Sequence, residues 1–341
     1  MTETLTIIHP DSPLLTKIKK YKKRASEIKK HLDLYPNEWG RFQSEFNQEI
    51  NGIFRDIMLY EKECIAKGSE DKIYKLKKFF IERLRTDFNH GDYIRRSLEK
   101  PFGYAGDFKI IDDIYLNNPS TSGFERLFDN YFLMSAAAVA TKNRKEDFKR
   151  ILTKFIEQND NKNPLRIMDL ASGPCRDIKE MLMNHPALCR GVTFDCYDND
   201  LNAIEFAKNL LAGISNMNFF QQNVVRLALK KDINNEIPYL YDLIFSTGLF
   251  DYLDERVSLR LISNLKKLLK PNGLMVISNY RDKYSNSSLH FMEWCGDWNL
   301  VYRTEDEFKT IFCDAGFSEL DLRMEYEQQG IMMYCFAKNV L

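Results

Sequence analysis

The second half of the chain alternates between short β-rich runs and helical stretches, and this alternation constrains the fold more than any other feature. Five such runs follow Pro164, each with a helical pattern behind it: LRIMDLA, GVTFDCYD, MNFFQQN, YDLIFSTG and GLMVISNY. Successive strand-then-helix units are typical of a doubly wound, mostly parallel α/β sheet. Two further runs, FSELDLRMEYEQQ and GIMMYCFAKN, have only Gln329 and Gly330 near the turn between them. We therefore predict a seven-stranded, Rossmann-like sheet that ends in an antiparallel pair.

The first half of the chain has a different rhythm. From about Pro13 to Phe88 it is dense in Lys, Glu, Leu, Ile and Phe, with few helix-breaking residues. Apolar positions there recur with the 3.6-residue period of a helix. We predict a helical lid and substrate region over residues 1–150 and a cofactor-binding sheet domain over residues 151–341.

Charge indicates what kind of ligand the protein binds, and cysteine content indicates the compartment in which it works. The 49 basic residues balance 49 acidic ones, so no net field favours nucleic acid, and a small-molecule substrate is expected. Seven cysteines without a C-x-x-C pair are typical of a reducing cytosol and argue against a disulfide framework or a zinc site. No basic segment followed by an apolar leader and no run of eighteen apolar residues occurs. We expect a cytoplasmic protein without a membrane span.

The stretch IMDLASGPCRD, residues 167–177, marks the expected ligand edge of the sheet. In an open parallel sheet, ligands bind outside the carboxyl ends of the strands. Asp169 lies near the end of the first predicted strand, and the small residues Ala171, Ser172 and Gly173 would let a ligand approach the backbone. Only Gly173 is a glycine, so the loop is not a G-x-G-x-x-G phosphate cradle. A plain strand-to-helix turn is the alternative interpretation.

Polar residues follow the next three predicted strands. Asp198 ends the second, where a carboxylate can accept hydrogen bonds from a ribose diol. Asp200 is better placed to cap the next helix, which leaves Asp198 available for the ligand. Asn223 and the amide of Val224 follow the third and could meet an adenine edge. Residues 246–250 follow the fourth and are expected to line the floor of the pocket.

In this order, the motifs DLASGP, YDND, QQNV, YDLIFSTGLFDYL and LLKPNGLMVIS resemble those of the class I S-adenosylmethionine-dependent methyltransferases, over roughly residues 163–341. The resemblance implies S-adenosylmethionine as cofactor, with the loop at residues 169–173 holding the methionine portion, and no metal. The predicted cofactor contacts are Asp169, Ala171, Ser172, Gly173, Asp198, Asn199, Asn223, Val224, Thr247 and Phe250.

Two further segments narrow the resemblance. EKPFGYAGDFKIIDDIY and FMEWCGDWNLVYRTEDEF, together with ISNY and TKNRKE, resemble a bacterial methyltransferase subfamily that includes the 3-hydroxy-fatty-acid methyl ester synthases. Gly103 and Gly106 would bend the first segment and present Tyr104 and Asp107 to the pocket, although Asp107 is also a natural helix cap. The predicted catalytic set is Tyr104, Asp107, Asn143 and Arg144, with Arg144 suited to binding a carboxylate through its two-pronged guanidinium.

The predicted chemistry is methyl transfer by direct displacement under a closed lid. A carboxylate acceptor is already ionised at neutral pH and needs no base, which suits a chain whose five histidines lie away from the predicted strand ends. We therefore expect O-methylation of a small carboxylate, fatty-acid-like or from secondary metabolism. One alternative is an azetidine-2-carboxylate synthase, in which the cofactor's own amine attacks its γ-carbon and expels methylthioadenosine. A cofactor-binding regulatory or partner subunit is the other.

Overall fold

The computed structural model describes residue 7, residues 12–159 and residues 164–340. Residues 1–6 and 8–11 lie outside this range. They include His9, one of the five histidines considered above, and part of the N-terminal segment to which the expectation about a leader refers. The chain divides into two compact units, Met1–Val139 with Lys283–Asn299 and Ala140–Asp282 with Leu300–Leu341. The expected boundary between residues 150 and 151 lies within the helix α8 (Ala136–Gln158) and stays a prediction.

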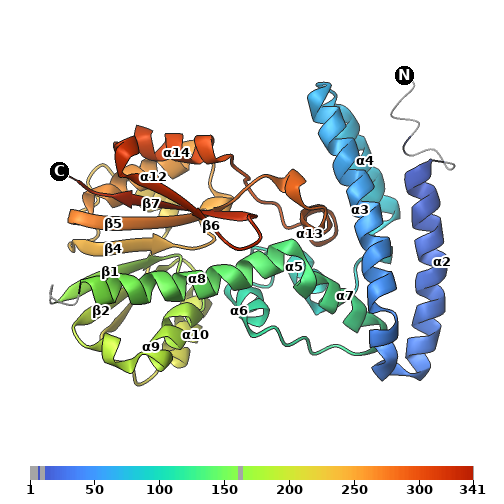
Figure 1. The fold of residues 1–341 in the computed structure, drawn as a ribbon, viewed down its shortest axis with the longest axis horizontal. Coiled ribbons are helices and arrows are strands. Elements are labelled where there is room, and N and C mark those ends of the chain that lie inside the picture. The colour runs from blue at the N-terminus through green and yellow to red at the C-terminus, as the bar shows by residue number, and fades with distance from the viewer. Residues whose placement is uncertain (1–6, 8–11, 160–163, 341) are drawn as a thin grey trace. The chain divides into compact units, whose positions relative to one another are not determined.

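The first unit, called here the helical unit, is built mainly from α-helices (Figure 1), and some of their connections contain short 3-10 turns, as at Pro36–Arg41 and Arg85–Asp87. Its long helices carry an apolar stripe, as in Phe46, Ile50, Phe54 and Ile57 of α3, whose three- and four-residue spacing places them on one helix face. The Phe54 ring lies edge-on to three others, with centroids 5.3 to 5.9 Å apart. The helices are α2 (Pro13–Leu34), α3 (Gln43–Ala66), α4 (Glu70–Arg83), α5 (Asp92–Glu99), α6 (Phe108–Leu116), α7 (Gly123–Met134) and α13 (Ser288–Gly296).

The second unit, called here the sheet unit, contains a seven-stranded sheet in the order β3-β2-β1-β4-β5-β7-β6. The first five strands are parallel, and β7 runs antiparallel to both β5 and β6. The strands are β1 (Leu165–Leu170), β2 (Val192–Asp198), β3 (Met217–Gln221), β4 (Tyr241–Ser246), β5 (Leu269–Tyr280), β6 (Leu322–Tyr326) and β7 (Met332–Lys338). The predicted fold class, with its antiparallel terminal pair, is confirmed.

The helices of the sheet unit explain why the strands read as apolar runs. β1 and β4 are buried at nearly every position, as expected for central strands covered on both faces, whereas the edge strand β3 is only half-buried. Leu227, Ile262 and Phe308 from three of the helices pack with Ile244 and Ile277 of the strands in one core. The helices that follow the strands are α9 (Arg176–Asn184), α10 (Leu201–Leu210), α11 (Val224–Leu229), α12 (Glu255–Lys267) and α14 (Glu305–Asp314).

No helix within the described residues combines the length and the apolar character needed to cross a bilayer.

Candidate functional site

The loop between β1 and α9 has an unusual backbone. Ala171, Gly173 and Cys175 have φ angles of 56°, 53° and 50°, so every second residue is left-handed. A side chain normally disfavours this conformation, and only Gly173 lacks a Cβ. The Ser172 amide donates to the Tyr197 carbonyl of β2 at 3.1 Å and fixes the loop beside the next strand. The glycine-poor loop therefore takes a backbone that glycine favours.

Asp198, at the carboxyl end of β2, holds two loops together. Its Oδ2 accepts a hydrogen bond from the Gly173 amide and its Oδ1 accepts one from the Asp200 amide, both at 2.9 Å. Asp200 caps α10 by accepting from the amide of Asn202, as expected. Burial raises the pKa of Asp198, against the hydrogen bonds that lower it. The cap of α10 is therefore Asp200 and not Asp198. The role of Asp198 toward a ribose stays a prediction.

The third loop joins the second through two asparagines. Asn223 caps α11 through its side-chain oxygen, which accepts from the Arg226 amide at 3.0 Å. Its side-chain nitrogen donates to the Asn199 side-chain oxygen at 3.3 Å. Val224 is the first residue of α11, so its amide belongs to the helix turn whose N–H groups have no partner within the helix. The structure thus brings the predicted residues of the first three strand ends together.

Buried acids gather around the first loop. Burial raises the pKa of Asp169 well above its usual range, and the nearby Cys175, Asp177 and Asp198 add to the rise. Burial also raises the pKa of Asp177. A positive charge placed beside these carboxyls would stabilise their ionised forms. The loop is therefore suited to a ligand that carries a cation.

Asp169, Cys175 and Cys196 also have the spacing of a metal site. Their ligand-type atoms lie within 4.8 Å of one another, and all three residues are buried. Contact with Cys175, followed by burial, raises the pKa of Cys196 well above its usual range. The expected absence of a metal stays a prediction.

The loop after β4 meets Arg144 of α8. A Cβ added to Gly248, whose φ is 80°, would lie 2.7 Å from Nη1 of Arg144. Arg144 is 4% exposed. Thr247 beside it is half-buried, whereas Phe250 is fully buried in the core of the unit. The site therefore contains a buried guanidinium at the carboxyl edge of the sheet, and a side chain at Gly248 would displace it.

Asp251, which was not among the predicted site residues, lies within reach of the charge of this guanidinium. Its Oδ1 accepts a hydrogen bond from the Tyr280 amide at the end of β5, at 2.7 Å. Burial raises the pKa of Asp251 to about 6, although the charges of Arg144 and Arg303 lower it. Its position directly after the STGLF motif was the available signal. Asp251 is therefore a buried acid whose pKa is raised by its surroundings.

Asn143, the neighbour of Arg144 in α8, forms a hydrogen bond with Glu327. Its side-chain nitrogen donates to Oε2 of Glu327 at 2.8 Å. Glu327 in turn accepts hydrogen bonds from the amides of Gln329 and Ile331, both at 2.7 Å, in the turn between β6 and β7. These contacts tie Asn143 to the end of the sheet, and its catalytic role stays a prediction.

Tyr104 and Asp107 belong to the helical unit. Asp107 is fully buried and caps α6 by accepting hydrogen bonds from the amides of Lys109 and Ile110, each at 2.9 Å. It also forms an ion pair with Arg96, whose Nε lies 3.0 Å from Oδ2. Tyr104 is half-buried in the connection before α6. Asp107 therefore has the structural role given as its alternative, and the roles of both residues toward a substrate stay predictions.

Comparison with known proteins points to one family for part of the sheet unit. Residues 168–275 match the family model described as a methyltransferase domain. A search of curated proteins finds no match. Among solved structures, a possible exported protein from Bordetella parapertussis is similar with a TM-score of 0.55 and 20% identity, over 69% of this chain and 80% of that chain. The carbon methyltransferase CurJ is similar with a TM-score of 0.52 and 11% identity, over 89% and 72%. At these identities the two structures support the fold.

The strained loop predicts a stabilising substitution. Ala171→Gly removes the Cβ from a left-handed residue, and we expect the free energy of unfolding to rise by about 1 kcal/mol. Urea denaturation measures it. Ala66→Gly, at the exposed end of α3, is the control and should lower stability. A lower free energy of unfolding in both Ala171→Gly and Ala66→Gly would show that the loop is not strained at Ala171.

Asp251 predicts a pH dependence of stability. Its pKa in the folded chain, about 6, lies above the usual 3.8, so its ionisation destabilises the fold as pH rises from about 4 to about 6. Asp251→Asn keeps an acceptor for the Tyr280 amide. We expect it to increase the free energy of unfolding, relative to the wild type, by about 1–3 kcal/mol more at pH 7.5 than at pH 4.5.

The exposed Asp314 at the end of α14 provides the control, since Asp314→Asn should change stability little at either pH. Equal effects of Asp251→Asn at the two pH values would contradict the assignment.

Proposed function

We propose that the S-adenosylmethionine-dependent methyltransferase formed by this chain transfers its methyl group to a carboxylate of a small molecule. The methyltransferase-domain match over residues 168–275 supports the transferase class, and S-adenosylmethionine is the cofactor that the sequence motifs imply. The acceptor we propose is a fatty-acid-like or secondary-metabolite carboxylate, and the product is its methyl ester.

The position of Arg144 carries the proposal. This guanidinium is buried at the carboxyl end of β4, against Gly248, on the edge where parallel sheets bind ligands. Its charge acts on Asp177 near the first loop and on Asp251 and Tyr280 near the last strands. A guanidinium binds a carboxylate through two parallel hydrogen bonds. Arg144 would thereby fix the orientation of the acceptor oxygen.

The scarcity of bases in the sheet unit supports an acceptor that is already ionised. In the described part of that unit His185 is the one histidine, and it follows the C-terminal end of α9, the opposite end from the cofactor loop. An alcohol or phenol acceptor would have to lose a proton, whereas a carboxylate with a pKa near 4 has none to lose. Alignment and exclusion of water then remain as the enzyme's main tasks.

The acids of the first loop fit the proposed cofactor. S-adenosylmethionine supplies an electrophilic methyl group on a positively charged sulfur. Asp169 and Asp177 would balance that charge and the ammonium of the methionine portion, because each is buried and its pKa is raised. The acceptor oxygen forms a bond to the methyl carbon while the carbon–sulfur bond breaks, and its electrons stay on sulfur.

An acceptor screen tests the reaction. We expect the protein, given methyl-labelled S-adenosylmethionine and 3-hydroxydecanoate, octanoate or benzoate, to form a labelled methyl ester with at least one of them. Arg144→Gln should raise KM for the carboxylate by about tenfold or more, the effect of a lost charge-assisted contact. Arg150→Gln is the matched control, because Arg150 lies on the same helix, is exposed and pairs with Asp147.

Two results would contradict the proposal. Methylthioadenosine released from S-adenosylmethionine alone would indicate cyclisation of the cofactor. An unchanged KM in the Arg144 variant would remove the carboxylate assignment.

Asp198 predicts the strength of cofactor binding. Asp198→Ala removes the proposed ribose acceptor and the contact with Gly173, so we expect S-adenosylhomocysteine to bind more weakly by about 1–3 kcal/mol in calorimetry. Asp200→Ala is the control, since its loss uncaps α10 and should lower stability with little change in affinity. Equal affinities of the Asp198 variant and the wild type would exclude the ribose assignment.

A further inference from the structure

The helical unit contains a cavity of its own. It has a volume of about 520 Å³ and is formed by α5, α6, α7 and the connection between α6 and α7. Cavities of roughly 300–1,000 Å³ are typical of small-molecule sites. Charged residues dominate its lining: three cations (Arg95, Arg96 and Lys109) and four acids (Asp92, Glu99, Asp113 and Asp129).

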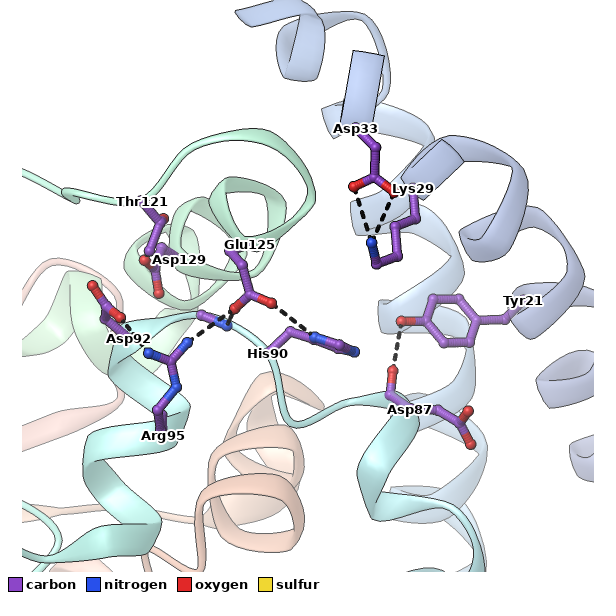
Figure 2. A network of polar contacts seen from close by, with 11 residues as sticks. Tyr21, Lys29, Asp33, Asp87, His90, Asp92, Arg95, Thr121, Glu125 and Asp129 are labelled. Carbon is purple, nitrogen blue, oxygen red and sulfur yellow. Dashed lines mark hydrogen bonds and ion pairs between the residues drawn. The ribbon is translucent and has the colours of Figure 1, made fainter. Parts of the chain in front are cut away.

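Each of the three cations already has an acidic partner. Nη1 of Arg95 lies 3.0 Å from Oδ1 of Asp92, and its Nη2 lies 3.2 Å from Glu125 (Figure 2). Arg96 pairs with the buried Asp107, and Lys109 pairs with Asp113 one helical turn away. The positive charge of the lining is thus neutralised within the unit, which disfavours an anionic ligand.

Asp129 and Glu99 are the acids of the lining that lack such a partner. Among the residues that the structure describes, neither forms an ion pair with a lysine, arginine or histidine. Asp129 is 1% exposed, and its oxygens accept hydrogen bonds from the Tyr93 amide at 3.2 Å and the Thr121 hydroxyl at 2.6 Å. Burial raises its pKa to about 6, and the neighbouring Asp92 adds to the rise. A buried carboxylate without a cation is costly, and a positively charged ligand would relieve that cost.

An aromatic ring adds to the preference for a cation. Tyr93 lines the cavity and is held by stacking on Phe132, with ring centroids 5.0 Å apart. An ammonium group near the face of a tyrosine ring is attracted by the negative face of the ring. Gly91 keeps the backbone close to Asp129, because a Cβ there would lie 2.4 Å from Oδ1.

We propose that this cavity binds a small organic cation of the alkylammonium class, with Asp129 and Glu99 as the charge partners and Tyr93 as the aromatic contact. The site lies within the helical unit, goes beyond methyl transfer and does not rest on it.

Titration of the full-length protein with butylammonium chloride tests the site, with ligand-detected NMR as the readout and potassium chloride keeping the ionic strength constant. We expect saturable binding to the wild type at pH 7.5 and none of sodium butyrate. Asp129→Asn should weaken butylammonium binding by about tenfold or more, the effect of losing a charged hydrogen-bond partner. Glu99→Gln, at an exposed position that should not disturb folding, should weaken it by a smaller factor.

Glu70→Gln is the matched control, because Glu70 is an exposed acid of α4 outside the cavity lining, and its binding should equal that of the wild type. Circular dichroism checks the fold of the buried Asp129 variant. If that variant does not fold, butylammonium binding by Glu99→Gln alone tests the site, and unchanged binding then contradicts the proposal. Three results would overturn the proposal: no saturable butylammonium binding to the wild type, preferential binding of butyrate, or unchanged binding in both the Asp129 and the Glu99 variants.

Discussion

The arrangement of the site depends on one carboxylate. Asp198 accepts hydrogen bonds from Gly173 in the first loop and from Asp200 in the second, so it fixes the distance between the ends of β1 and β2. Without it, two backbone amides at the edge of the sheet would need other partners. The charge of Asp198 also contributes to the raised pKa of the buried Asp169. Structure and ligand preference thus rest on the same group.

The first loop shows that residues other than glycine can hold a left-handed backbone. Ala171 and Cys175 hold left-handed angles that glycine would take without strain. Cys175 is fully buried beside Cys196, so packing offsets part of the cost of its conformation. Strain of this kind persists at functional sites because the surrounding contacts determine the geometry more strongly than the local preference does.

Much of the sheet unit could be predicted from sequence because its signals are local. The buried runs of β1 and β4, the cap at Asp200 and the antiparallel pair β6 and β7 each leave a pattern within a few residues. Asp251 was missed because its raised pKa arises from burial in the folded unit, which no local sequence pattern shows, and because the cations that act against this rise, Arg144 and Arg303, are distant in the chain. Asp107 was ambiguous for a similar reason, since its pairing with Arg96 across eleven positions depends on how α5 and α6 pack. Asp129 and Glu99 of the cavity in the helical unit share no sequence motif, because separate segments of the chain form the cavity.

The place of β7 in the sheet has a consequence for how the chain is made. β7 follows β6 in sequence, yet it lies between β5 and β6 and pairs with both. A nascent chain that has been synthesised only as far as β6 therefore has an open edge on β5 and a β6 strand with no neighbour. Such edges can pair with other chains. The sheet of this unit can therefore be completed only after β7 has been synthesised.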